Sequence, residues 1–146
     1  MHPHETVDFH IKTSWHSISK MYNLIAAQYG VTQAVGYVLL IIDEQGVLAT
    51  KIGPILGMEA TGMSRVLKSM ENDGLILRKK DNSDLRKVKI CLTPLGIEKR
   101  KIASGVVKEF NHSILNEISE KEFSTFKTVI DKIQKVVEKH KKLTID

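Results

Sequence analysis

The sequence predicts a mainly helical fold that carries one small β-hairpin. Apolar residues recur at helical spacings of three and four over most of the 146 residues, and this spacing changes to two only between residues 75 and 92. A glycine follows each of the first four helical stretches, so several short helices are expected rather than a few long ones.

Size and composition indicate one globular domain, residues 1–146. Apolar residues make up 42% and charged residues 27%, which argues against disorder. Cys91 is the single cysteine, so an intramolecular disulfide framework is excluded. The longest apolar run, Val38 to Ile42, is far shorter than the roughly 18 residues of a membrane span, and the first residues do not resemble a signal peptide. We therefore expect a cytoplasmic protein with no membrane partner.

Four helices are expected in the first half of the chain. The first covers about residues 8–29, and Thr32 can cap a second that stops before residues 43–46. A short third helix over residues 50–56 contains Pro54, which removes a backbone donor. The fourth runs from Ala60 to Asn72, and its buried face carries Met63, Val66, Leu67 and Met70.

The hairpin and two further helices follow. Residues 75–77 form the apolar start of the hairpin, residues 79–84 its polar turn, and residues 87–92 an alternating strand with Val88, Ile90 and Leu92 on one side. Thr93 and Pro94 can open the next helix, and Ser119 can cap a last one. These two helices span about residues 95–142.

The positive charge is concentrated on the hairpin and its flanks. Residues 75–101 hold nine basic and three acidic side chains, a net +6, whereas the whole chain carries +5. A local excess of this kind attracts a polyanion such as nucleic acid, although a solvated lysine-rich face has the same composition.

The order of elements predicts a winged helix-turn-helix at about residues 32–95, with N- and C-terminal dimerisation helices. In this arrangement the second helix of the pair enters the major groove of DNA, and the hairpin, or wing, reaches an adjacent groove or phosphates. The long apolar stripes outside this module exceed what it can cover, which favours a homodimer over helices that fold back on their own subunit. The expected DNA-facing residues are Ala60, Thr61, Gly62, Ser64, Arg65 and Lys68 of the helix and Asp84, Arg86 and Lys87 of the wing.

Two motifs of the sequence are specific in combination. The wing contains Asp84-Leu85-Arg86 followed after five residues by Leu92-Thr93, and the preceding helix leads into Gly74-Leu75-Ile76-Leu77-Arg78. With these motifs, residues 32–100 resemble the MarR family of transcriptional regulators. The resemblance implies a homodimeric regulator, commonly a repressor, that binds a pseudo-palindromic operator and responds to a small aromatic or anionic effector.

The resemblance also assigns roles to individual residues. Arg86 is the expected minor-groove arginine, and Asp84 orients it or closes the turn. Thr61, Ser64 and Arg65 fall where family members contact bases and phosphates. The sequence departs from the family at Leu85, where arginine is frequent, and at residues 53–54, where a Gly-Pro pair replaces ordinary helix formers.

Several residues allow more than one interpretation. Trp15, His16, Tyr22 and Tyr37 are candidates for the lining of an effector pocket, against the alternative that aromatic residues on a helical stripe belong to the core or a dimer interface. Cys91 is expected to be an inert, partly buried thiol. Six histidines raise the alternative of a zinc-responsive regulator, but their spacing matches no helical metal site, so no cofactor or metal is expected. No catalytic motif is present, which leaves a protein-interaction module as the other alternative to a DNA-binding regulator.

Overall fold

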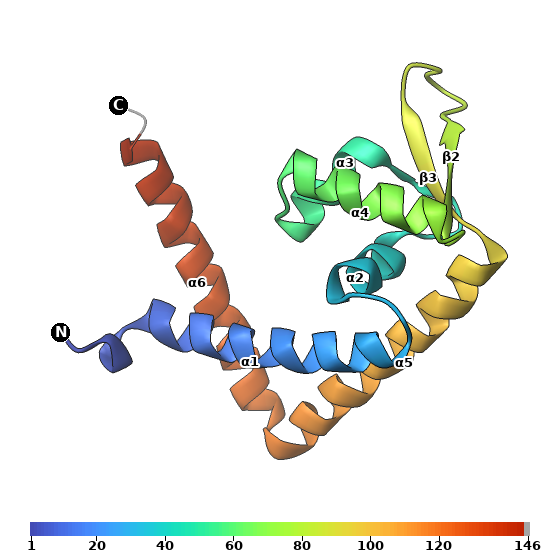
Figure 1. Cartoon of the computed structure of the whole chain (residues 1–146). Helices are drawn as coiled ribbons and strands as arrows, with labels where there is room; N and C mark the ends of the chain where they lie inside the picture. Colours follow the sequence, from blue (N-terminus) through green and yellow to red (C-terminus); the bar gives the residue numbers. More distant parts are fainter. Residues whose placement is uncertain (145–146) are drawn as a thin grey trace. The chain divides into compact units, whose positions relative to one another are not determined.

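The computed structural model describes residues 1–144, and within them six α-helices and three β-strands follow a short 3-10 helix, η1 (Pro3–Glu5) (Figure 1). Ile145 and Asp146, the last residues of the expected domain, lie outside the described residues. The chain divides into two compact units, Met1–Gly105 and Val106–Asp146. The elements in order are α1 (Val7–Gln28), α2 (Gln33–Ile41), β1 (Val47–Leu48), α3 (Ala49–Leu56), α4 (Ala60–Asn72), β2 (Ile76–Lys80), β3 (Val88–Leu92), α5 (Pro94–Glu117) and α6 (Glu120–Thr144).

Helix α2 begins at its predicted cap. Thr32 Oγ1 accepts a hydrogen bond from the backbone N–H of Val35 at 3.2 Å and so satisfies one donor of the first turn of α2. Between α3 and α4, Gly57 adopts a left-handed conformation with φ 64°, which ends α3 and turns the chain toward α4. The bounds of α4 are those predicted from the sequence.

The structure explains why the Gly-Pro pair of α3 begins with a glycine. Gly53 is buried, and a Cβ atom at this position would lie 3.0 Å from the carbonyl oxygen of Met58. The glycine therefore allows the chain to turn tightly after the helix. Pro54 lies inside α3, and its carbonyl accepts the N–H of Gly57 at 3.3 Å.

A three-stranded antiparallel sheet forms the base of the wing, with the strand order β1-β3-β2. Strand β1 was not predicted, because two residues are too short to show periodicity. The sequence assigned residues 79 and 80 to the turn, whereas β2 extends through Lys80, which pairs with Val88. Ile90 is fully buried, and Cys91 lies on the opposite face, as the alternation predicted.

The core of the first unit lies where α2, α3, α4 and the sheet meet. Side chains from each of these elements contribute, and none of the buried ones among the described residues is polar or charged. The largest fully buried side chains are Leu39, Ile42, Ile52, Met70, Ile76, Ile90 and Val38.

The start of α5 is attached to the base of the wing. Thr93 Oγ1 accepts a bond from the N–H of Gly96 at 3.1 Å and donates to the carbonyl of Gly74 at 2.5 Å, while the N–H of Thr93 donates to the carbonyl of Leu75 at 3.0 Å. A Cβ atom on Gly96 would overlap that Leu75 carbonyl. The predicted cap therefore also joins the helix to the strand before it.

The second unit contains the C-terminal part of α5 and all of α6. The predicted cap forms a reciprocal pair, because Ser119 Oγ accepts from the N–H of Glu122 at 3.1 Å and Glu122 Oε2 accepts from the N–H of Ser119 at 2.7 Å. None of the described residues between 106 and 143 is buried. Large apolar side chains of α6 are exposed, among them Phe126 at 58% and Val136 at 54%.

Within residues 1–144, no individual helix has the length and apolar content needed to cross a membrane. Helices α1 and α2 meet those criteria only as a pair, and they are bent by 87° relative to each other.

Candidate nucleic-acid interface

Helix α4 separates a buried face from an exposed polar face. Met63, Leu67 and Met70 are at most 3% exposed and contribute to the core. Among the predicted DNA-facing residues of α4, Gly62 is half-buried and the others are exposed. The exposed ones are Ala60, Thr61, Ser64, Arg65 and Lys68.

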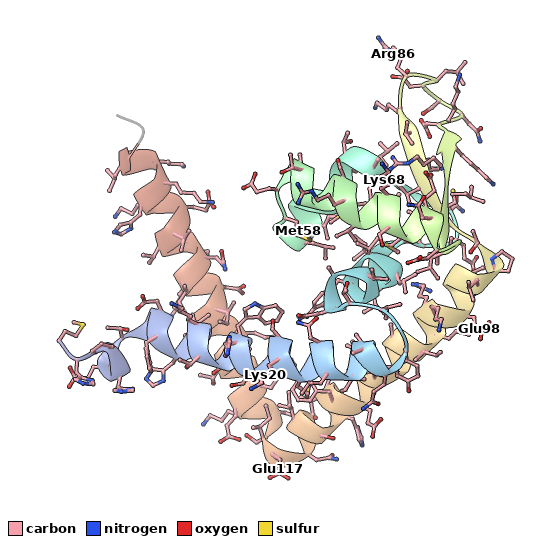
Figure 2. All side chains as sticks on the ribbon, viewed as in Figure 1. Lys20, Met58, Lys68, Arg86, Glu98 and Glu117 are labelled. Atoms are coloured by element: carbon pink, nitrogen blue, oxygen red, sulfur yellow. The ribbon has the colours of Figure 1, made fainter. Side chains whose placement is uncertain are left out.

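The cations of α4 are free to bind a partner. Within residues 1–144, the side chains of Arg65 and Lys68 form no hydrogen bond or ion pair. Figure 2 shows Lys68 extending from α4 toward the side on which the wing ends at Arg86. Lys68 and Arg86 therefore lie on one exposed side of the first unit.

The N-terminus of α4 is uncapped by a side chain. Its N-cap residue, Glu59, makes no side-chain cap hydrogen bond, and the first bond of the helix runs from the N–H of Met63 to the carbonyl of Glu59. The N–H groups of residues 60–62 have no acceptor within the described chain. Such donors, with the positive end of the helix dipole, can bind a phosphate.

The wing ends in a turn that Asp84 organises. The N–H of Lys87 donates to the carbonyl of Asp84 at 3.0 Å, which makes Leu85 and Arg86 the two central residues. Asp84 Oδ1 accepts from the backbone N–H and from Nε of Arg86, both at 3.1 Å, and Oδ2 accepts from Nη2 at 3.2 Å. Asp84 thus closes the turn and orients the arginine, whose side chain is 90% exposed.

Two carboxyl groups of the wing have a lowered pKa. The pKa of Asp84 lies below 3.8 because the Arg86 side chain, and then its backbone N–H, hydrogen-bonds the carboxylate. The pKa of Asp81 is lowered first by the hydrogen bond from the Ser83 hydroxyl and then by the charge of Lys89. Both groups are ionised at neutral pH.

The structure divides the nine cations of residues 75–101 into engaged and free groups. Arg78 pairs with Glu71 at 3.2 Å, and Lys89 Nζ lies 4.0 Å from Asp81. Lys99 Nζ donates to the carbonyl of Tyr29 at 3.3 Å, at the C-terminal end of α1. The charge available to a partner is therefore smaller than the sequence count. Among the described residues it is carried by the exposed lysines Lys79, Lys80, Lys87 and Lys101, whereas Arg86 is exposed but paired with Asp84.

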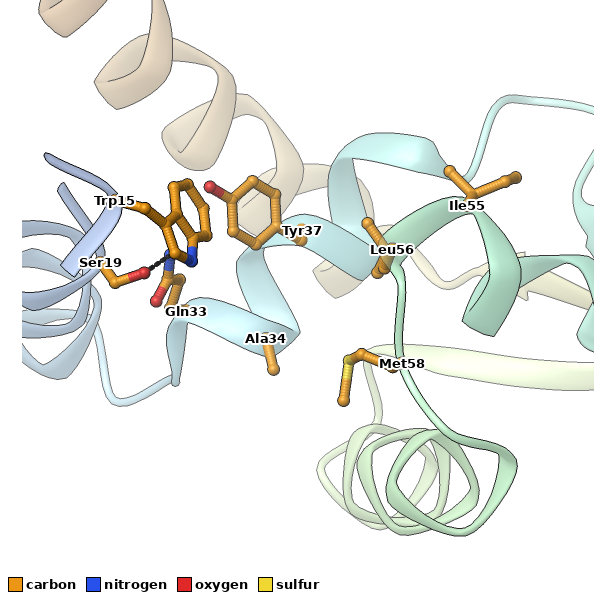
Figure 3. Close-up of a pocket in the computed structure, with 8 residues that line it drawn as sticks. All are labelled: Trp15, Ser19, Gln33, Ala34, Tyr37, Ile55, Leu56 and Met58. Carbon is orange, nitrogen blue, oxygen red and sulfur yellow. Dashed lines mark hydrogen bonds between the residues drawn. The ribbon is translucent and has the colours of Figure 1, made fainter. Parts of the chain in front are cut away.

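A pocket of about 430 Å³ lies between α1, α2 and the α3–α4 turn (Figure 3). Of the four candidate aromatic and histidine residues, it brings together Trp15 and Tyr37, whose rings are 6.3 Å apart. His16 and Tyr22 do not line it, although the Tyr22 ring lies 6.4 Å from that of Tyr37. Burial, and then Tyr37, raises the pKa of Tyr22. The full lining is Trp15, Ser19, Gln33, Ala34, Tyr37, Ile55, Leu56 and Met58.

Sequence reasoning missed the polar side of this pocket. Gln33 Nε2 donates to Ser19 Oγ at 3.3 Å, and Asn23 exchanges two hydrogen bonds of 3.1 Å with Gln33. These bonds join α1 to the first turn of α2. The one signal available was that Gln33 directly follows the predicted cap, Thr32, because this places it where two helices meet.

No group of three or more metal-ligating side chains occurs within residues 1–144. Cys91 is partly buried, as expected, and a Cβ atom on Gly46 would lie 2.8 Å from its sulfur.

The fold and the exposed cationic side define a winged helix-turn-helix protein. A family model described as "MarR family" matches residues 31–88. This part of the chain is therefore similar to the MarR family, whose members are transcriptional regulators.

The chain is also similar in sequence to curated regulators, and its fold is similar to that of solved structures. The transcriptional regulator SarZ of Staphylococcus epidermidis is 25% identical over 131 residues, which cover 88% of this chain and 84% of SarZ. TtmR of Methylorubrum extorquens is 29% identical over 89 residues, 60% of this chain and 46% of TtmR. The fold is similar to that of Staphylococcus aureus MepR in its DNA complex, with a TM-score of 0.81 and 22% identity over 90% of this chain and 98% of the MepR chain. The fold is also similar to that of the transcriptional regulator SlyA, with a TM-score of 0.78 and 22% identity over 89% of this chain and 92% of the SlyA chain.

Proposed function

We propose that this protein is a cytoplasmic regulator that binds a pseudo-palindromic operator as a homodimer, with α4 in the major groove and the wing in the adjacent minor groove. The observation that carries this proposal is the exposed face of α4, where Arg65 and Lys68 have no partner within residues 1–144 and lie beside the hydroxyl groups of Thr61 and Ser64. Cations and hydroxyl groups at the start of such a helix are the usual donors to base edges and phosphates.

Gly62 supports a close approach of DNA to α4. Within the described chain, the nearest atom to a Cβ built on Gly62 is Met58 Cε at 3.8 Å, an ordinary contact. Packing inside the subunit therefore does not require glycine here, although glycine costs a helix about 1 kcal/mol relative to alanine. A backbone that must approach a phosphate or a base edge accounts for this cost.

The charge pattern of the wing supports binding of a polyanion. Lys79 and Lys89 are directly opposite each other in the β2–β3 register, so their side chains share one face. Like charges at this distance destabilise a free hairpin, and Asp81 relieves only one of them. A phosphate backbone along this face compensates for the repulsion and releases counterions.

The exposed apolar side chains of the long helices support the homodimer. In α1, Trp15 is 51% and Leu24 64% exposed, and α6 exposes Phe126 and Val136 to a similar extent. Burial of such surface by a second copy in a two-fold arrangement removes it from water.

The Trp15–Tyr37 pocket supports regulation by a small ligand. The two rings can stack on an aromatic molecule, and Ser19 and Gln33 supply neutral hydrogen-bonding groups. No charged side chain lines the pocket, which favours an aromatic over an anionic effector. We expect the ligand to release DNA, so that the protein acts as a repressor.

The test is a salt titration of DNA binding with the full chain and a duplex that it enriches from a random-sequence pool. Arg86→Ala is expected to weaken binding about tenfold and to lower the salt dependence by about one ion. Lys132→Ala, an exposed cation of α6, is the matched control and is expected to bind as the wild type.

Each other outcome counts against part of the proposal. Unchanged affinity of Arg86→Ala overturns the assignment of the wing. Failure of the wild type to enrich or retard any duplex at low salt favours a protein-interaction module, and binding that depends on added zinc or chelator favours the metal-responsive alternative. A monomer in light scattering rejects the dimer.

A further inference from the structure

Leu85 lies in the turn at the end of the wing. It is the first of the two central residues in the turn from Asp84 to Lys87, and Arg86 is the second. The turn contains no residue with positive φ, so it is an ordinary turn closed by the Asp84 carboxylate. The position of the Leu85 side chain is therefore set by the backbone and not by packing.

Leu85 is 70% exposed, more than any other large apolar residue of the described chain except Met1. It contributes neither to the core nor to the half-buried shell around it. Single exposed leucines are common on protein surfaces, so exposure by itself assigns Leu85 no role. The role inferred below depends on its place in the turn, directly beside Arg86.

The neighbour of Leu85 limits what the tip can do by charge alone. Three hydrogen bonds hold Arg86 against Asp84, and the two opposite charges largely cancel at a distance. The tip therefore presents one apolar side chain next to one tethered guanidinium group. This combination fits a narrow groove with apolar walls and a negative floor, which is the minor groove of A·T-rich DNA.

We propose that Leu85 packs against the deoxyribose walls of the minor groove beside Arg86 and selects against G·C pairs at that site. This inference rests on the proposed DNA-binding function and names the residue that sets the preference for the flanking base pairs. Guanine places an N2 amino group in the minor groove, whereas A·T pairs present only acceptors there. A leucine side chain offers that amino group no acceptor and covers it from water.

The first experiment separates apolar from ionic contact by measuring affinity against salt, with the duplex enriched by the wild-type chain. Leu85→Ala is expected to bind about tenfold more weakly at every salt concentration, with an unchanged slope, because burial of a leucine side chain is salt-independent. Leu85→Lys is expected to steepen the slope by about one ion. Leu95→Ala, the same change at a 41% exposed leucine outside the wing, is expected to bind as the wild type.

The second experiment tests selection directly. G·C pairs are placed at the wing contact and then replaced by inosine·C pairs, which lack the N2 amino group. The wild type is expected to prefer the inosine duplex severalfold, and Leu85→Ala is expected to lose most of this preference, whereas Leu85→Met retains it.

The outcomes distinguish this inference from the proposed function. If Leu85→Ala binds as the wild type while Arg86→Ala is weakened, the leucine contact is wrong and the wing assignment stands. A changed slope in Leu85→Ala, or an undiminished inosine preference, also overturns the leucine contact. If neither variant differs from the wild type, the assignment of the wing fails and the inference fails with it. If the wild type binds no duplex, the proposed function itself fails.

Discussion

Replacement of Gly96 by alanine is expected to lower the free energy of unfolding by about 2 to 4 kcal/mol. A Cβ atom at this position would overlap the backbone carbonyl oxygen of Leu75 and lie 3.2 Å from Leu92 Cδ2. Contacts of Cβ closer than 3.0 Å are essentially absent from real structures, and a carbonyl cannot rotate away as a flexible side chain can. The start of α5 and the Leu75 carbonyl would have to move apart by about an ångström.

The magnitude follows from the bonds at this junction. Separation strains or breaks the bond from Thr93 N–H to Leu75 and the bond from Thr93 Oγ1 to Gly74, each worth about 1 kcal/mol. Overpacking adds about 1 to 3 kcal/mol, and the higher helix propensity of alanine returns about 1 kcal/mol.

The assay is urea unfolding followed by far-UV circular dichroism at a fixed protein concentration. Gly105→Ala is the matched control, because Gly105 lies in the same helix and a Cβ there meets nothing within 4 Å. We expect this control to be stabilised by about 0.5 to 1 kcal/mol. Equal stability of the two variants would refute the close approach of α5 to Leu75.

Two further predictions concern the wing and its base. The carboxyl pKa of Asp84, measured by carbon NMR, is expected to lie below 3.8 and to rise toward that value in Arg86→Ala. Because the pKa is lowered in the folded state, the contact stabilises the fold at a pH above the ordinary pKa, and this stabilisation is lost as the pH falls through the folded-state pKa. A midpoint at or above 3.8 in the wild type would exclude the contact. Thr93→Val is expected to destabilise the chain by about 1 to 2 kcal/mol in the same urea assay, since it removes the cap of α5, whereas Thr93→Ser is expected to lose much less, and a silent Thr93→Val would contradict the role of the hydroxyl.

The parts of the fold that depend on local signals were predictable. The bounds of α4 follow from its apolar stripe and from the glycines on either side, and the caps Thr32, Thr93 and Ser119 act where the sequence placed them. Strand β1 and the last two residues of β2 were not predictable, because they depend on pairing with β3, a partner far away or across a turn.

The candidate site divides in the same way. The helical periodicity of α4 determines which of its residues are exposed, so the exposure of the polar residues between Thr61 and Lys68 was predicted correctly. The pocket required tertiary packing, and only Trp15 and Tyr37 of its eight lining residues were named in advance. A charge count also could not predict the ion pair of Arg78 with Glu71 or the hydrogen bond of Lys99 to Tyr29. Counting charges does not distinguish a cation that is bound within the fold from one that is free.

The turn at the end of the wing is held by its own atoms, whereas its base is held by β1, Thr93 and the core. Residues 82–87 can therefore be exchanged as a short cassette that retains the Asp84–Arg86 bonds, without loss of the elements below it. In the proposed DNA complex, substitutions at the tip would alter the choice of flanking DNA while the contacts of α4 stay constant. During divergence or engineering, the two parts of an operator could then change one at a time.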